Sequence, residues 1–123
     1  MIMKILTCLL PLLLGSTALL QNAHAADSQS LYKEECADCH SIREGKNKKG
    51  PSLWNVVGRK AASVADFDYS ESLRNSGIVW TPDKISAYLE NPKKLVPGGK
   101  MKYDGLPDPQ DRQAIIDYLT TLR

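Results

Sequence analysis

Two cysteines and a histidine stand close together in the motif Cys36-Ala37-Asp38-Cys39-His40. Cysteines three positions apart lie on the same side of a helical turn, so both thiols can add to the vinyl groups along one porphyrin edge. The histidine that follows can offer its imidazole to the iron as an axial ligand. The spacing therefore predicts one covalent haem, attached through Cys36 and Cys39, with His40 as the proximal ligand.

A Cys-x-x-Cys pair is also compatible with two other chemistries, a dithiol redox site and a structural disulfide. A dithiol of the thioredoxin type follows a buried strand, whereas residues 31–35 have the polarity of an amphipathic helix. The histidine directly after the pair favours haem. A disulfide-stabilised module without haem is the alternative interpretation.

The first 25 residues have the features of a secretory signal peptide. Lys4 precedes an apolar run that extends to Leu20, and Ala23-His24-Ala25 has the small-x-small pattern that signal peptidase cuts. We therefore expect residues 1–25 to be cleaved and residues 26–123 to form a monohaem domain in the periplasm. An uncleaved membrane anchor is the alternative, although the apolar run is short.

Composition limits the mature protein to one small domain. Of the 123 residues, 42% are hydrophobic and 24% are charged, and 16 of the hydrophobic ones fall within the leader. The remaining chain is lean in core residues, so a large apolar cofactor would help to stabilise it. This size excludes a two-domain enzyme. A formal net charge of +2, or +1 without Lys4, excludes a general nucleic-acid binder.

Local patterns predict an all-α fold with long loops. We expect helices at about residues 28–39, 70–74, 82–90 and 109–122, with a capping residue or a proline at each start. The cap of the first helix is predicted at Asp27 or Ser28, and Asn91-Pro92 is predicted to end the third. The last helix has an apolar stripe at i, i+3, i+4 and i+7. Outside the helices, residues 77–80 are predicted to pair briefly with another extended segment.

The second axial ligand of the iron follows by elimination. The mature chain has no second histidine, and Met101 is its only thioether. Met101 ends a loop, residues 96–101, in which proline adds stiffness and two glycines add freedom, so its side chain can lie against a flat ring. A thioether ligand favours ferrous iron and raises the reduction potential. Ligation by Lys93, Lys100 or water is the alternative, as is a packing role for Met101.

Together these features resemble the class I c-type cytochromes, in particular the mitochondrial type and its bacterial relatives. The resemblance covers nearly all of residues 26–123 and implies a small cytochrome c fold, with several helices and long loops wrapped around one covalent haem c. Beyond the Cys-x-x-Cys-His motif it rests on six segments: Gly50-Pro51-Ser52-Leu53, Val57-Gly58-Arg59-Lys60, Gly77-Ile78-Val79-Trp80, residues 88–94, Pro97-Gly98-Gly99-Lys100-Met101 and Ile116-Asp117-Tyr118-Leu119.

The resemblance also implies roles for residues around the haem. The Pro51 carbonyl would accept a hydrogen bond from the second ring nitrogen of His40 and so fix its tautomer. Tyr88 would donate to the sulfur of Met101. Three side chains would donate to the buried haem propionates: Arg59, Tyr69 and Trp80. Two tyrosines would pack where the first and last helices cross: Tyr32 and Tyr118.

Three positions depart from the family pattern. Leu73 stands where an asparagine is common, Gly99 where a threonine helps to hold a propionate, and Tyr103 where a phenylalanine lies beside the haem edge. These changes leave the iron ligands in place but bear on the reduction potential and on the rigidity of the loop. We predict a looser methionine loop than in relatives that have threonine at position 99.

An iron with both axial positions filled by protein has no open site for a substrate. We therefore expect a soluble, monomeric electron carrier rather than an enzyme, with a cytochrome bc complex, an oxidase, a reductase or a dehydrogenase as redox partner. A haem enzyme or gas-binding protein with an open iron is the rival hypothesis. Seven lysines would surround the haem edge and favour partners with acidic docking patches: Lys46, Lys48, Lys49, Lys93, Lys94, Lys100 and Lys102. Four aspartates would face elsewhere: Asp104, Asp108, Asp111 and Asp117.

Overall fold

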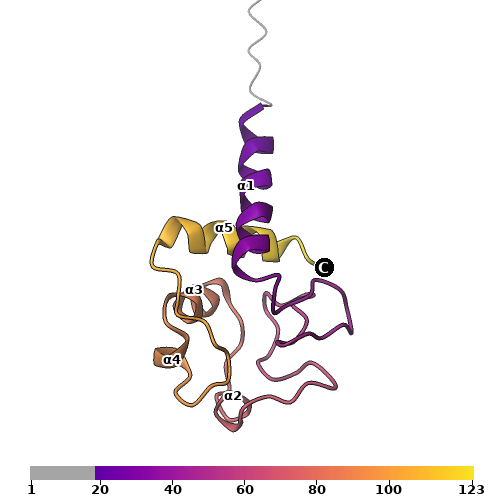
Figure 1. The fold of residues 1–123 in the computed structure, drawn as a ribbon, viewed down its shortest axis with the longest axis vertical. Coiled ribbons are helices and arrows are strands. Elements are labelled where there is room, and N and C mark those ends of the chain that lie inside the picture. The colour runs from indigo at the N-terminus through magenta and orange to yellow at the C-terminus, as the bar shows by residue number, and fades with distance from the viewer. Residues whose placement is uncertain (1–18) are drawn as a thin grey trace, which may run out of the picture.

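The computed structural model describes residues 19–123, with side chains from Asp27 onward, and these residues form helices joined by long loops (Figure 1). Residues 1–18 of the predicted signal peptide lie outside the described residues. The helices are α1 (Leu19–Glu35), α2 (Glu71–Arg74), α3 (Pro82–Glu90), α4 (Pro92–Leu95) and α5 (Pro109–Thr120). The predicted all-α class is confirmed. Within the described part, no helix combines the length and the apolar character needed to span a bilayer.

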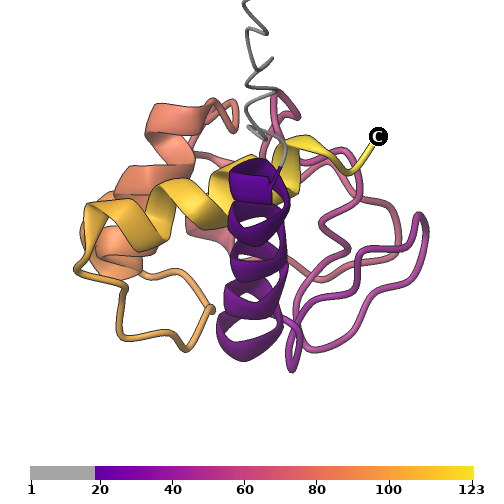
Figure 2. The same cartoon turned by 90° about the horizontal axis from the view of Figure 1, so that it is seen from above.

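The first and last helices cross each other, and α5 also packs on α3 (Figures 1 and 2). At the crossing, the rings of Tyr32 and Tyr118 lie 4.9 Å apart with 44° between their planes, as the resemblance implied. Ile115 is fully buried. The apolar stripe predicted for the last helix is confirmed, and Leu122 continues it into the core two residues beyond the end of α5.

The two ends predicted for the first helix are wrong. The helix begins at Leu19, so Asp27 and Ser28 lie inside α1, because the leucine, glutamine and alanine residues before them continue it. It ends at Glu35 rather than at Cys39. The carbonyl of Cys36 accepts hydrogen bonds from both the Cys39 and the His40 N–H groups, which tightens the last turn and leads the chain out of the helix.

Asn91 both ends one helix and starts another. Its backbone N–H donates to Ala87 at the end of α3, while its side chain accepts from the backbone N–H of Lys94 in α4 at 3.1 Å. The predicted end of α3 is therefore confirmed, but α4 was not expected. Proline is tolerated at the first position of a helix, so Pro92 starts α4 where it had been interpreted only as a stop.

The brief pairing predicted for residues 77–80 is confirmed. Val79 forms an isolated antiparallel bridge with Lys60. Flanking hydrogen bonds run from Ala61 to Ile78 at 2.8 Å and from Trp80 to Arg59 at 2.9 Å. The bridge fixes the loop of residues 55–69 to the start of α3, and it brings Arg59 and Trp80 to the same side of the molecule.

Candidate functional site

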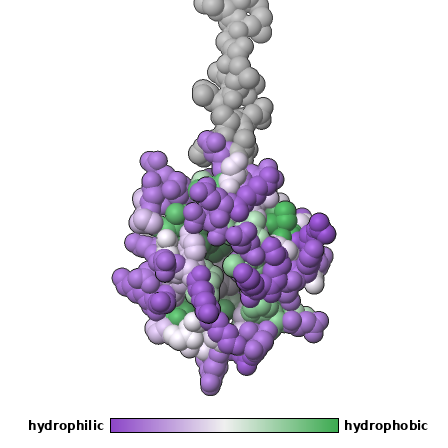
Figure 3. Space-filling model, in the orientation of Figure 1, coloured by the Kyte–Doolittle hydropathy of each residue, from purple (hydrophilic) through white to green (hydrophobic). Residues whose placement is uncertain are grey.

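A cavity of about 440 Å³ lies between the loops of residues 36–70, the helices and the segment around Met101. The face shown in Figure 3 is mainly hydrophilic, with paler and hydrophobic atoms in the hollow near its middle. The structure brings all of the predicted site residues to this one cavity: Cys36, Cys39, His40, Pro51, Arg59, Tyr69, Trp80, Tyr88 and Met101. Hydrophobic residues of three helices form much of the remaining wall: Leu73, Ile85, Leu89, Ile115 and Leu119.

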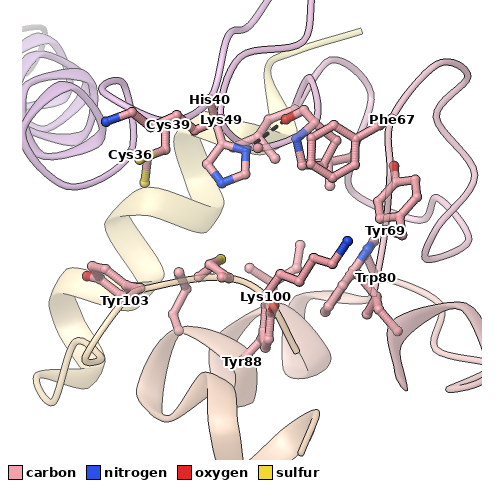
Figure 4. A pocket seen from close by; sticks show the side chains of 18 of the residues that line it. Cys36, Cys39, His40, Lys49, Phe67, Tyr69, Trp80, Tyr88, Lys100 and Tyr103 are labelled. Carbon is pink, nitrogen blue, oxygen red and sulfur yellow. Dashed lines mark hydrogen bonds between the residues drawn. The ribbon is translucent and has the colours of Figure 1, made fainter. Parts of the chain in front are cut away.

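The imidazole of His40 is fixed by its neighbours. Its Nδ1 lies 2.7 Å from the carbonyl oxygen of Pro51, and in the tautomer that donates to this oxygen, Nε2 faces the cavity (Figure 4). Burial lowers the pKa of His40. A lowered pKa favours the neutral ring, whose Nε2 lone pair can bind a metal ion in the cavity.

Gly50 is the residue that makes room for this imidazole. A Cβ atom at position 50 would lie 2.3 Å from Cε1 of His40, which is far inside van der Waals contact. The backbone N–H of Gly50 also donates to the carbonyl of Cys39 at 2.8 Å. Sequence analysis named Gly50 only within a family segment and missed its contact with His40, because the two residues are ten positions apart.

The two cysteines of the motif are free thiols and half-buried, so the disulfide alternative has no counterpart in the structure. Both side chains point into the cavity beside the imidazole (Figure 4). Burial raises the pKa of Cys36 to about 12, with a further contribution from the charge of Glu35. Before any modification this thiol is therefore protonated near neutral pH.

The segment that carries Met101 forms the wall opposite His40, as its neighbours Lys100 and Tyr103 show in Figure 4. Met101 is half-buried and lines the cavity. On the same side, the ring of Tyr88 lies 5.0 Å from that of Trp80. Burial raises the pKa of Tyr88, so its hydroxyl remains a hydrogen-bond donor.

Polar groups gather at the end of the cavity away from the cysteines. Arg59 donates to the backbone carbonyls of Trp54 at 2.6 Å and Ser52 at 2.9 Å, and burial lowers its pKa. The hydroxyl of Tyr69 accepts a hydrogen bond from the backbone N–H of Val64, which leaves its own hydrogen to donate to another acceptor. This end therefore offers donors to an acidic group.

Phe67 is a wall residue that sequence analysis missed. Its ring lies 4.8 Å from that of Tyr69 in an edge-to-face arrangement. It is the only phenylalanine of the chain, which could have drawn attention to it. Nothing in the local pattern of this loop, however, indicates which way the ring faces.

The residues present fit a covalent haem. Two free thiols lie beside a neutral imidazole, the walls are largely hydrophobic, and hydrogen-bond donors stand at the far end. In the part of the chain whose side chains are described, no three His, Cys, Asp or Glu side chains converge on a point where a bare metal ion would sit. The site therefore suits iron that is already bound in a porphyrin, rather than a bare metal ion.

Comparison with known proteins agrees with this geometry. The cytochrome c family model matches residues 25–123. The chain belongs to the cytochrome c family. Cytochrome c2 of Rhodopila globiformis is 50% identical over 97 residues, which cover 79% of this chain and 92% of that protein. Cytochrome c of Arabidopsis thaliana is 44% identical over 96 residues, which cover 77% and 86%. The solved structure of cytochrome cH from Methylobacterium extorquens has a TM-score of 0.73 at 38% identity, covering 79% of this chain and 97% of that one.

These matches confirm a class I c-type cytochrome of the bacterial, mitochondrial-like kind, with the all-α cytochrome c fold. Membership of the family gives the cofactor, a haem c bound covalently through Cys36 and Cys39. It also gives the general function, because members of this family are electron carriers.

Proposed function

We propose that this cytochrome is a soluble one-electron carrier, and not an enzyme, with His40 and Met101 as the axial ligands of its haem iron. One observation carries the proposal: His40 and Met101 line the same cavity, and the segment that holds Met101 faces the imidazole across it. When bound, the haem supplies a reversible one-electron change between ferric and ferrous iron. Two protein ligands leave no position at which a substrate could bind the metal.

The surrounding residues would keep structural change small when the iron gains or loses an electron. The Pro51 carbonyl fixes the imidazole, so His40 does not have to rotate between the two oxidation states. Arg59, Tyr69 and Trp80 would hold the propionates at the polar end of the cavity, and Tyr88 would donate to the sulfur of Met101. Small movement on electron transfer is what a carrier requires.

Location and processing follow from the leader. We propose that residues 1–25 are a signal peptide, that cleavage follows Ala25, and that residues 26–123 act as one domain in the periplasm. The support is the small-x-small pattern before residue 26 and the similarity to bacterial cytochromes c2. An anchored form that retains the leader would be distinguished by the mass of the purified protein.

Lysines near the cavity support acidic redox partners. Lys49, Lys100 and Lys102 line the cavity, and Lys93 joins the last two at a shallow depression beside it. Asp104 lines the same depression, so the prediction that it faces elsewhere is wrong. It reduces the local positive charge without reversing it. We propose transient encounters between a monomer and a cytochrome bc complex, an oxidase, a reductase or a dehydrogenase.

An optical spectrum of the purified holoprotein tests the ligand assignment. We expect the ferric protein to have a weak band at about 700 nm, typical of thioether ligation, and the ferrous protein not to bind carbon monoxide. The variant Met101→Ala should lose the band and bind carbon monoxide. A wild-type protein that lacks the band and binds carbon monoxide would instead support a haem enzyme or a gas-binding protein. Absence of the band without carbon monoxide binding would point to Lys93 or Lys100 as the ligand.

A further inference from the structure

A hydrogen bond joins the methionine segment to the end of the first helix. The hydroxyl of Tyr103 donates to Oε2 of Glu35 at 2.5 Å, across 68 positions of sequence. Glu35 is the last residue of α1 and directly precedes Cys36, and both partners line the cavity. The contact depends on the hydroxyl that distinguishes Tyr103 from the phenylalanine common in the family at this position.

A second contact holds the other side of Met101. Nζ of Lys100 lies 2.9 Å from Oδ2 of Asp68, and the same carboxylate accepts from Arg74 at 2.8 Å. These side chains are largely exposed, at 81% for Asp68 and 59% for Lys100. An exposed ion pair contributes little in water and less in salt, so this contact is the weaker of the two.

The segment between these contacts has little else to hold it. Among the described residues, the backbone of residues 100–105 forms no hydrogen bond with another backbone group. The next backbone hydrogen bond along the chain is that of Leu106, whose N–H donates to the carbonyl of Leu89 at 2.7 Å. On the other side, Gly98 has a φ of +81°, and Gly99 adds a second position without a side chain. Side-chain contacts must therefore supply much of the restraint on Met101.

We infer that Tyr103 is a positioning residue whose hydrogen bond to Glu35 holds the Met101 segment against α1, with Lys100 and Asp68 as a weaker second contact. The inference rests on the proposed role of Met101 as an iron ligand. Tyr103 lies two residues after Met101, so release of its hydroxyl would let the thioether leave the iron more often. The hydroxyl would then replace part of the restraint that a threonine at position 99 supplies in relatives.

Displacement of the thioether by imidazole tests this inference in the ferric holoprotein. At saturating imidazole, the rate at which the band at about 700 nm disappears is limited by dissociation of Met101 and opening of its segment. Tyr103→Phe retains the ring and removes only the hydroxyl, and Glu35→Gln removes the charged acceptor. We expect each to raise the rate about tenfold, as for the loss of a hydrogen bond to a charged group. The double variant should be no faster than either single one.

Two matched variants separate the contact from a general effect of charge. Glu34→Gln removes the same charge one position earlier, where the exposed side chain has no hydrogen-bond partner among the described residues, and should leave the rate unchanged. Lys100→Gln should raise the rate about twofold in dilute buffer and not at ~1 M salt, whereas Lys84→Gln, exposed on α3 and outside the cavity wall, should have no effect in either.

The outcomes also separate this inference from the ligand assignment. If the wild-type band is present but Tyr103→Phe and Glu35→Gln open at the wild-type rate, the inference is overturned and the ligand assignment stands. Equal acceleration by Glu34→Gln and Glu35→Gln would overturn it as well, because it would indicate a general effect of charge. A wild-type protein without the band would overturn both the inference and the assignment.

Discussion

At the scale of single residues, the site depends on the absence of a side chain at position 50. Gly50 has no side chain, and the imidazole of His40 occupies the space that a Cβ atom would fill. Its φ is not in the left-handed region, so any residue could adopt this backbone conformation. The requirement for glycine is therefore steric and concerns His40 alone.

We expect Gly50→Ala to force the His40 ring away from the Pro51 carbonyl. Overpacking of this kind costs about 1 to 3 kcal/mol, so the free energy of unfolding of the holoprotein should fall by that amount. The reduction potential should change too, because His40 loses the acceptor that strengthens it as a ligand. Denaturant titration and voltammetry would measure these changes. Lys49→Ala, one position earlier in the same loop, is the control, and equal behaviour of the two variants would contradict the steric argument.

At the scale of elements, Arg112 joins α5 to two other parts of the fold. It is buried, with 8% of its surface exposed. Its Nε donates to the Ser86 hydroxyl of α3 at 3.0 Å, and its Nη1 donates to the carbonyls of Leu106 and Pro107 at 2.8 and 2.7 Å. A guanidinium carries donors on three separate nitrogens and so reaches acceptors that lie apart from one another, whereas the three N–H groups of a lysine ammonium all start from one nitrogen.

Replacement of this arginine by lysine should therefore destabilise the protein although the charge is kept. We expect Arg112→Lys to lower the free energy of unfolding by about 2 kcal/mol, because at least one buried carbonyl loses its donor. The exposed Arg74→Lys is the matched control and should change it by less than about 0.5 kcal/mol. Urea denaturation of both variants would measure the difference. A similar loss in both would indicate that the burial of Arg112 contributes nothing.

Local sequence patterns predicted the elements better than their ends. Capping residues were predicted at the helix starts, and Ser70, Thr81 and Asp108 each accept a backbone N–H there, because capping depends on residues a few positions apart. The start of α1 and the whole of α4 were not predicted. A helix starts at a cap only if the residues before it do not continue it, and Asn91-Pro92 has the features of both an end and a beginning.

The sequence predicted which residues form the candidate site, but not all of the contacts that hold them in place. The Cys-x-x-Cys-His motif, Met101 as the single methionine after residue 25, and the family resemblance led to the residues that line the cavity. Sequence analysis gave no indication of the contacts of Tyr103 with Glu35 and of Lys100 with Asp68. These join residues 68 and 32 positions apart, and their pairing depends on how whole loops lie against each other.

At the scale of the whole molecule, the cavity is large for a chain of this size. Without the haem, its largely hydrophobic walls would face water instead of the macrocycle, and each Å² of apolar surface left exposed costs roughly 25 cal/mol. The total stability of a small domain is only about 5 to 15 kcal/mol, so such a loss is significant. The haem is therefore a part of the core as well as the redox group.

We expect the double variant Cys36→Ala, Cys39→Ala, exported without haem, to lose cooperative folding. Far-ultraviolet circular dichroism during heating should show no sigmoidal transition, and limited proteolysis should cut the chain at many sites. Cys36→Ala alone, which can keep one thioether bond to the haem, is the control and should still melt cooperatively. A cooperative transition in the haem-free double variant would contradict the view that the haem completes the core.

Charge around the cavity should govern the rate at which the protein associates with its redox partners. Lys102→Gln removes a positive charge that lines the cavity, so the second-order rate of electron exchange with an acidic partner should fall about two- to fivefold at low ionic strength. The exposed Lys84→Gln, on α3 and not among the cavity residues, should leave it nearly unchanged. Stopped-flow rates measured over a range of salt would decide this. A rate that does not depend on salt would contradict electrostatic steering.

Asn91 caps both α3 and α4, and this double role couples the local unfolding of the two helices. Because one residue closes α3 with its backbone and opens α4 with its side chain, neither helix can fray at that junction without disturbing the other. The two should therefore exchange their amide hydrogens as one cooperative unit. The boundary of that unit falls just after Val96, before the positive φ of Gly98. Residues 100–105 form no backbone hydrogen bond with another backbone group of the described chain, so we expect residues 98–105 to exchange as a separate unit while the helices around them stay intact.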